Sequence, residues 1–274
     1  MDKQYYYLIT SLPLLRLDDY KGPYRVTDFV NELNEHLIPR HCEYAQDILY
    51  AYDNAYIIDA VLKRDVPLAR HTASMSFEQI KEKIKNKDYE ADEYLVSFLE
   101  EFSQINREGE GFSRKQAERL ILTRYFERRV NHPNRFIRNY FQFELDLRNI
   151  LVALNKRRFD LKQVDFIEAG DQAIINRLKN STASDFGLSA DIDYIVELVE
   201  TFNKNDIMHC EKYIDILRWQ RIDEINKLNY FEVDVLLGYL VKLMLVERWI
   251  ALDAQKGRGV FERRTTVENS LFFK

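Results

Sequence analysis

The sequence is poor in residues that break helices or cross-link chains. It contains eight glycines, five prolines and two cysteines in 274 residues, and the prolines stand only at positions 13, 23, 39, 67 and 133. The second half is therefore free to form long helices. Cys42 and Cys210 lie far apart and form no CxxC pair, which favours a reducing cytoplasm over a disulfide scaffold.

A long apolar run is also missing. The longest, Val233 to Val246, is short for a membrane span and contains Asp234 and Lys242. The N-terminal sequence MDKQYYYLITSLPLL lacks a basic region followed by a sustained apolar core, so it does not resemble a signal peptide. We expect the chain to have no transmembrane segment of its own.

An excess of positive charge is absent too. The net charge is -5 and the pI is about 5.7, so no global field attracts phosphate backbones. One basic segment, Arg114 to Arg129, interleaves arginines with aromatic residues in a pattern that could contact RNA. Its apolar residues fall nearly all round a helix, which favours arginine stems covering a buried helix. Nucleic acid is not an expected partner.

The motifs of common enzymes are missing as well. There is no GxxxxGK[ST] phosphate loop, no GxSxG nucleophile turn, no HExxH zinc motif and no EF-hand loop. The glycine pair Gly257 and Gly259 follows a helical pattern instead of joining a strand to a helix. We therefore predict no catalytic residues and no cofactor-binding residues.

Metal-ligating groups are few and badly spaced. Three sets come closest: His36, His41 and Cys42 around Pro39; the adjacent His209 and Cys210; and the carboxylates Asp193, Glu197 and Glu200. The first set straddles a proline, the second pair points apart on a helix, and the third lacks the Glu-x-x-His partner of di-iron bundles. We predict core or solvated side chains at these positions and no bound metal.

Helical periodicity dominates what the sequence does contain. With 46% hydrophobic residues the chain can bury a large core, and the pattern predicts an all-α multi-helix bundle. The predicted helices cover a short N-terminal segment and then 27–38, 40–65, 76–102, 114–130, 135–159, 171–178, 192–199, 206–225 and 231–252. Capping boxes open the segments at Ser76 and Ser113, and Thr27 and Asp206 are predicted N-caps. The tail from Gln255 is predicted to be irregular.

Two polar, small-residue stretches are the clearest linkers, EGEGFS at 108–113 and KNSTASDFGLSAD at 179–191. They suggest an N-terminal lobe over 1–112, a central lobe over 113–187 and a C-terminal lobe over 188–274. An internal echo is compatible with three related lobes: DNAYIIDAVLKR from Asp53 aligns with DLRNILVALNKR from Asp146, and YFEVDVLL from Tyr230 with YFQFELDL from Tyr140. Chance similarity between amphipathic helices explains such short matches equally well.

The segment from Arg135 to Asp160 is the predicted spine of the fold. It carries apolar residues on two opposite helical faces, whereas a surface helix needs only one. The first face holds Phe136, Tyr140, Phe143, Leu147, Ile150, Leu151 and Leu154, and the second holds Phe141, Leu145 and Val152. This helix should therefore be packed on both sides.

Polar residues run between the two apolar faces of the spine. Glu144 and Arg148 have i,i+4 spacing, and Asp146 and Asn149 lie on the other edge. Charges in such an apolar helix are costly unless paired. We therefore predict that these four residues form a structural set that ties neighbouring helices to the spine, and that replacing Asp146 with alanine destabilises the protein.

The spine resembles a known family. FELDLRNILVALNKRRF is similar to the signature helix of the C subunit of V-type ATPases, which is called the d subunit in the eukaryotic complex. The resemblance rests on Phe143, Glu144, Asp146, Asn149, Ile150, Lys156 and Arg157. The aromatic N-terminal half looks like a compact bacterial branch of that family, and the chain is shorter than the usual member.

The resemblance implies a funnel of three related helical lobes and a non-catalytic role. Such a protein sits on the membrane rotor ring of a rotary ATPase and receives the central shaft, coupling ATP turnover to proton or sodium transport. The chain would then be cytoplasmic and bound to the membrane only through the complex. Two alternatives stay open at this stage: a helical metal-dependent enzyme, and a free-standing helical scaffold.

Overall fold

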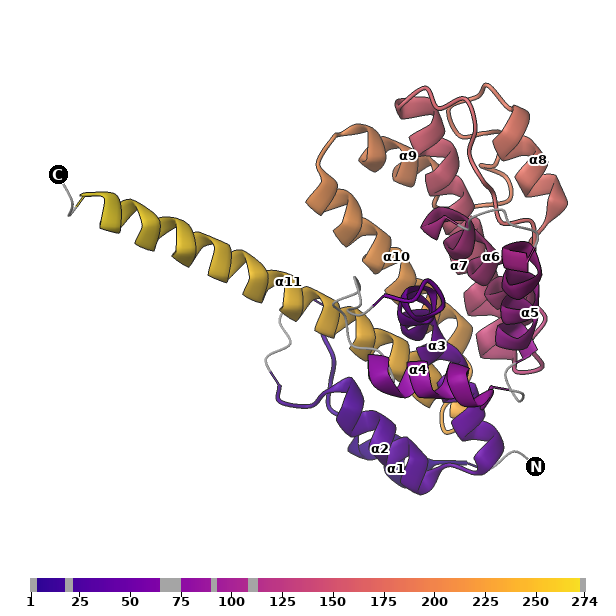
Figure 1. Cartoon of the computed structure of the whole chain (residues 1–274), viewed down its shortest axis with the longest axis vertical. Helices are drawn as coiled ribbons and strands as arrows, with labels where there is room; N and C mark the ends of the chain where they lie inside the picture. The colour runs from indigo at the N-terminus through magenta and orange to yellow at the C-terminus, as the bar shows by residue number, and fades with distance from the viewer. Residues whose placement is uncertain (1–3, 18–21, 65–74, 90–92, 108–112, 272–274) are drawn as a thin grey trace.

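The fold is built from α-helices only, as the periodicity predicted. A computed structural model describes residues 4–17, 22–64, 75–89, 93–107 and 113–271, and within these ranges it contains eleven helices and no strand (Figure 1). Beyond Leu252 only the course of the last helix is described. The first predicted linker, at 108–113, lies outside the described residues except for Ser113.

The helices follow one another with short connections. Their bounds are α1 Tyr6–Ser11, α2 Val26–His36, α3 Pro39–Val61, α4 Phe77–Asn86, α5 Glu93–Arg107, α6 Arg114–Val130, α7 Arg135–Arg158, α8 Gln172–Asn180, α9 Ile195–Asn203, α10 Ile207–Asn226 and α11 Val233–Leu271. Most predicted segments are confirmed to within a few residues, including the short N-terminal helix that a strand-like composition had made ambiguous.

Local capping explains several helix starts. The predicted capping boxes are confirmed: Ser76 accepts a hydrogen bond from the Gln79 N–H, and Ser113 accepts one from the Gln116 N–H. Asp206 caps α10 by accepting from the His209 N–H at 3.0 Å. The predicted cap at Thr27 is wrong. The N-cap of α2 is Arg25, two residues earlier, and Asp28 accepts a hydrogen bond from the Arg25 N–H at 2.8 Å.

Two predicted element boundaries are also wrong. The segment 76–102 is not one helix, because α4 ends at Lys87, whose left-handed backbone (φ 59°) forms a C-cap. The tail from Gln255 is not irregular either: α11 continues through Leu271 over 39 residues, about 58 Å at 1.5 Å per residue. Once a helix is nucleated, each further residue costs little, so it can continue without an apolar period.

Helix α7 lies at the centre of the bundle, as its two apolar faces predicted. It packs against α6, α8, α10 and α11. The first face is buried at Phe136, Tyr140, Phe143, Leu147, Ile150 and Leu154, and the second at Phe141 and Leu145; Leu151 and Val152 are half-buried. The buried apolar side chains form one continuous cluster from Tyr5 in the N-terminal segment to Met244 on α11. The core therefore spans all three of the predicted lobes.

Gly238 sets how closely α10 and α11 approach. A methyl group added at this position would lie 2.5 Å from Asn226 Nδ2 and 2.8 Å from Ile222 Cγ2. Asn226 also donates a hydrogen bond from Nδ2 to the Asp234 carbonyl at 2.9 Å. A glycine is therefore required on α11 where the two antiparallel helices and the side chain of Phe136 meet.

Candidate functional site

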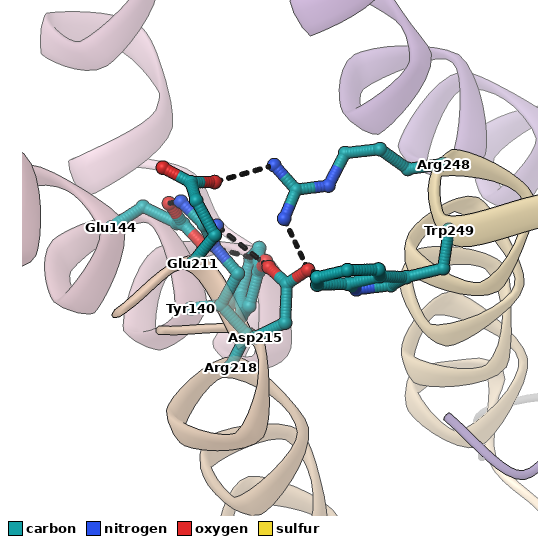
Figure 2. Close-up of polar contacts among 7 residues, drawn as sticks. All are labelled: Tyr140, Glu144, Glu211, Asp215, Arg218, Arg248 and Trp249. Carbon is teal, nitrogen blue, oxygen red and sulfur yellow. Dashed lines mark hydrogen bonds and ion pairs between the residues drawn. The ribbon is translucent and has the colours of Figure 1, made fainter. Parts of the chain in front are cut away.

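A network of charged side chains joins α7, α10 and α11 inside the bundle (Figure 2). Its centre is Asp215 on α10, whose side chain is fully buried. One Asp215 oxygen accepts a hydrogen bond from Arg218 Nη1 at 2.9 Å, and the other accepts from Trp249 Nε1 at 2.7 Å and from the Arg248 guanidinium. Both oxygens of this carboxylate are thus occupied by donors from α10 and α11.

Arg218 extends the network to the spine. Its Nε and Nη2 donate to the two oxygens of Glu144 on α7 at 2.7 and 3.0 Å, a bidentate arrangement. Tyr140 donates to the same carboxylate at 2.8 Å, and Arg248 reaches Glu211 at 3.2 Å. Helix α7 and the consecutive helices α10 and α11 are therefore linked by two arginines and three carboxylates.

Burial and charge set the protonation behaviour around this network. Burial lowers the pKa of Arg218, but the nearby Glu144 carboxylate outweighs it, so the pKa lies well above its ordinary value. Burial, reinforced by Glu144, raises the pKa of the Tyr140 hydroxyl well above its usual range. Burial also raises the pKa of Tyr52, on α3, to about 12, although Arg248 and Arg218 act in the opposite direction. These tyrosines remain neutral donors at physiological pH.

A second polar cluster ties α3 to α6 and to the turn before α7. The Asp47 carboxylate on α3 lies 2.8 Å from Arg129 Nη2 and 3.0 Å from His132 Nε2, while the Asp47 carbonyl accepts a hydrogen bond from the Tyr125 hydroxyl at 2.9 Å. His132 Nδ1 accepts from the Asn134 N–H at 3.0 Å, which assigns the ring proton to Nε2. The Arg129 guanidinium also lies 4.7 Å from the centre of the Tyr125 ring.

The four residues predicted as a polar set on the spine behave differently from one another. Glu144 bonds a neighbouring helix, as predicted, but its partner is Arg218 and not Arg148. Asn149 is buried and exchanges two hydrogen bonds with the backbone of Ile167, in the segment between α7 and α8. The set as a whole does not converge on one site.

The predictions for Asp146 and Arg148 are wrong. Asp146 accepts a hydrogen bond from Gln142 of its own helix at 3.1 Å and has no bond to a neighbouring helix among the described residues. Burial, together with the nearby Asp171, raises the pKa of Asp146 to about 6. Arg148 is exposed. Arg221, on α10, acts on the Asp146 carboxylate electrostatically but forms no ion pair with it among the described residues, whereas Arg218 of the same helix bonds Glu144.

Sequence reasoning missed Asp215, Arg218 and Arg248. The first two occupy α10 with spacing i and i+3, next to the buried Ile214 and Leu217. Tyr213, Ile216 and Trp219 of the same helix are only half-buried. The available signal was the charged pair flanked by more deeply buried aliphatic residues, together with Arg248, two residues after the apolar run of α11.

The arrangement offers little for catalysis or metal binding. Within the described ranges, no group of three His, Cys, Asp or Glu side chains could hold a metal ion. Cys42 and Cys210 are free thiols, and burial raises the pKa of both. Both oxygens of Asp215 already accept from donors of the network, and the network lines neither the hollow between α5 and α6 nor the one beside the α9–α10 turn. Its bonds hold α7, α10 and α11 together.

Exposed apolar side chains gather at the two ends of α10. At its start lies the α7–α10 surface, which consists of Phe159, Leu161, Ile207 and Met208. Past its end lies the α1–α11 surface, which consists of Tyr6, Tyr7, Leu228 and Tyr230. Ile207 is 77% exposed and Leu228 is 75% exposed, and exposed apolar residues that lie together can mark interaction sites.

Contacts beside each surface link the elements that carry it, and one hollow is lined by both Arg158 of α7 and Asn205, two residues before Ile207. Arg158, at the end of α7, lies 5.7 Å from the Phe159 ring and 5.1 Å from the Phe202 ring, just before the α9–α10 turn. At the other end, the Tyr6 and Phe231 rings are 4.2 Å apart. Helix α10 has 20 residues, which separates the two surfaces by about 30 Å. Figure 1 places the α9–α10 turn and the α1 region at opposite ends of the bundle.

No helix of the described part of the chain combines the length and the apolar character needed to cross a membrane. The chain matches a family model described as a protein of unknown function (DUF2764) over residues 1–267. It is similar to an uncharacterized protein of Chlamydia muridarum (strain MoPn / Nigg), with 20% identity over 175 residues. That alignment spans 62% of this chain and 63% of the relative, and no solved structure matches the chain.

Proposed function

The chain belongs to the family described as protein of unknown function (DUF2764), and we propose that it is a non-catalytic coupling subunit of a rotary V-type ATPase. In this role it bridges the central shaft and the membrane rotor ring. It is cytoplasmic and reaches the membrane only through the complex. The spine sequence, with its resemblance to the C subunit of V-type ATPases, supplies the identity of the complex.

The two apolar surfaces at opposite ends of α10 are the observation that carries the proposal. A bridging protein needs two separate contact surfaces, and exposed apolar groups mark such surfaces. A body that transmits torque must also resist deformation between them. The interhelical bonds of Asp215 and Arg218 supply that resistance along α10, the helix that connects the two surfaces.

Co-purification with the neighbouring subunits tests the proposal. Tagged protein, expressed with the rotary ATPase genes of the same genome, should recover both shaft and ring subunits. Deletion of the chain should uncouple ATP hydrolysis from ion movement and leave the catalytic head active. Recovery of neither partner, or turnover of a substrate by the purified chain alone, would overturn the proposal in favour of a scaffold or an enzyme.

A pair of surface variants makes the test specific. Ile207→Asp places a charge on the α7–α10 surface, and Leu228→Asp places one on the α1–α11 surface. Because both side chains are exposed, neither change should unfold the bundle. Each variant should lose one of the two partners and keep the other, so each serves as the control for its counterpart. Loss of both partners by either variant would contradict a two-ended bridge.

A further inference from the structure

A groove with an arginine rim lies next to the α7–α10 surface, since Arg158 precedes Phe159 and Asn205 is two residues before Ile207. The groove is lined by Leu154, Arg157 and Arg158 from α7, by Ser184, and by Val199, Asn203 and Asn205 around the α9–α10 turn. This lining contains two guanidinium groups, two amides and no carboxylate. Leu154 and Val199 are buried apolar residues that form its deeper part. The chain as a whole carries a net charge of -5, so this concentration of positive charge is local.

The two arginines of the rim have different tasks. Arg157 is committed to the fold, since its guanidinium donates to the carbonyls of Ala183, Ser184 and Ser181 at 2.7, 3.2 and 2.6 Å. Arg158 is exposed, and among the described residues its guanidinium donates one hydrogen bond, to the Phe202 carbonyl at 3.3 Å. A guanidinium has five N–H donors, so Arg158 keeps most of its donors available in a geometry suited to a carboxylate.

More unpaired positive charge borders the groove. Lys204 stands between the two asparagines of the lining, and Lys162 follows the exposed Leu161; both are exposed and neither has a carboxylate partner among the described residues. Of the carboxylates that border the same segments, Asp185 and Asp206 accept hydrogen bonds from the Gly187 and His209 N–H groups, and Asp160 is exposed. By contrast, cations elsewhere on the surface, such as Arg177 and Lys242, are paired with Asp191 and Asp223 at 2.6 and 2.5 Å.

We infer that this surface binds an acidic, partly apolar segment of a protein, with a carboxylate at Arg158 and apolar side chains against Phe159 and Ile207. The inference rests on the proposed function, in which the soluble central shaft supplies the segment. The ring is the less suitable partner, because the cytoplasmic loops of membrane proteins are enriched in lysine and arginine and would be repelled here. An anionic bilayer is disfavoured by the net negative charge of the whole chain.

Charge reversal at the groove tests the inference. The probe is the purified assembly of central-shaft proteins from the same genome, titrated against the full chain by calorimetry at two salt concentrations. Arg158→Glu and Lys204→Glu should each weaken binding by about tenfold, and the loss should shrink at high salt. Arg158→Lys should retain more affinity than Arg158→Glu, because it keeps the charge and loses only the bidentate geometry.

Lys85→Glu is the matched control, since Lys85 is an exposed lysine on α4 with no carboxylate partner among the described residues. It should leave shaft binding unchanged, and circular dichroism should show that all variants are folded. If Arg158→Glu and Lys204→Glu both bind the shaft as tightly as the unmodified protein does, the inference is wrong. The bridging proposal still holds in that case, provided that the unmodified protein binds both shaft and ring.

Two further outcomes separate the alternatives. Wild-type protein that binds neither shaft nor ring would overturn the proposed function together with this inference. Vesicles of phosphatidylglycerol serve as the lipid probe in a parallel experiment. If the charge reversals abolish vesicle binding but not shaft binding, the surface is a lipid contact and the inference is wrong.

Discussion

Asp215 is the residue whose loss should damage the bundle most. Its buried carboxylate satisfies Arg218, Arg248 and Trp249 at once. Asp215→Ala leaves two guanidinium groups without their shared partner, and we expect a loss of about 3–5 kcal/mol in the free energy of unfolding. Urea denaturation followed by circular dichroism measures it. Glu224→Ala, which removes an exposed carboxylate from the same helix, should change stability by less than about 1 kcal/mol; an equal loss in both variants would contradict the assignment.

Replacing Asp146 should have the opposite effect from replacing Asp215, because it should increase the free energy of unfolding at neutral pH. Its pKa is raised by burial from 3.8 to about 6, so the folded chain holds the proton to higher pH than the unfolded chain does. The contribution of Asp146 to the free energy of unfolding is therefore most favourable below pH 4, and it becomes unfavourable as the pH rises through 6. Asp146→Asn should stabilise the protein by about 1–3 kcal/mol at pH 7 and by little at pH 4.

Denaturation of wild type and Asp146→Asn at both pH values decides this prediction. The exposed Asp88→Asn provides the control, and it should show no comparable gain at pH 7. Destabilisation by Asp146→Asn at pH 7 would favour the expectation from the sequence, in which Asp146 is paired to a neighbouring helix. The structure reverses that expectation because the nearest partner, Gln142, belongs to the same helix.

At the scale of the helices, the antiparallel contact of α10 and α11 depends on Gly238. In an ordinary helix, Gly→Ala is stabilising by about 1 kcal/mol. Here the added methyl group meets Asn226 and Ile222, so Gly238→Ala should destabilise by about 1–3 kcal/mol despite the better helix propensity. Combining it with Ile222→Ala should cost less than the sum of the two single changes. Strict additivity in this double-mutant cycle would show that the contact is not the cause.

The sequence predicted the positions of the helices better than it predicted which charged side chains bond one another. Helix α7 was located almost to the residue because two apolar faces and a following loop constrain it, and the capping boxes at Ser76 and Ser113 were confirmed because they are local. Asp215, Arg218 and Arg248 come together only when α7, α10 and α11 pack. Such contacts have no local period, so helical spacing could not reveal them. The same i,i+4 spacing predicted a pair of Glu144 with Arg148 that does not form.

For the whole molecule, the continuous core predicts that the three proposed lobes do not fold separately. Helices α2 and α3, from the first lobe, pack against α11 from the third, and α3 also packs against α6 from the second. A fragment of residues 1–112 would expose the apolar side chains that those contacts bury. It should therefore lack the sharp thermal transition of the full chain. A cooperative melting transition of the isolated fragment, followed by circular dichroism, would instead show an independent lobe.

The length of α11 has a geometric consequence. Beyond Trp249, which with Arg248 bonds to Asp215, the helix continues for 22 residues to Leu271, about 33 Å, and Figure 1 shows its C-terminal part extending away from the bundle. Because the helix is fixed at that point, a rotation of about 5° there displaces the far end by about 3 Å, for a helix of that length. Small changes in the packing of α10 are thus converted into larger displacements at a distance from the core.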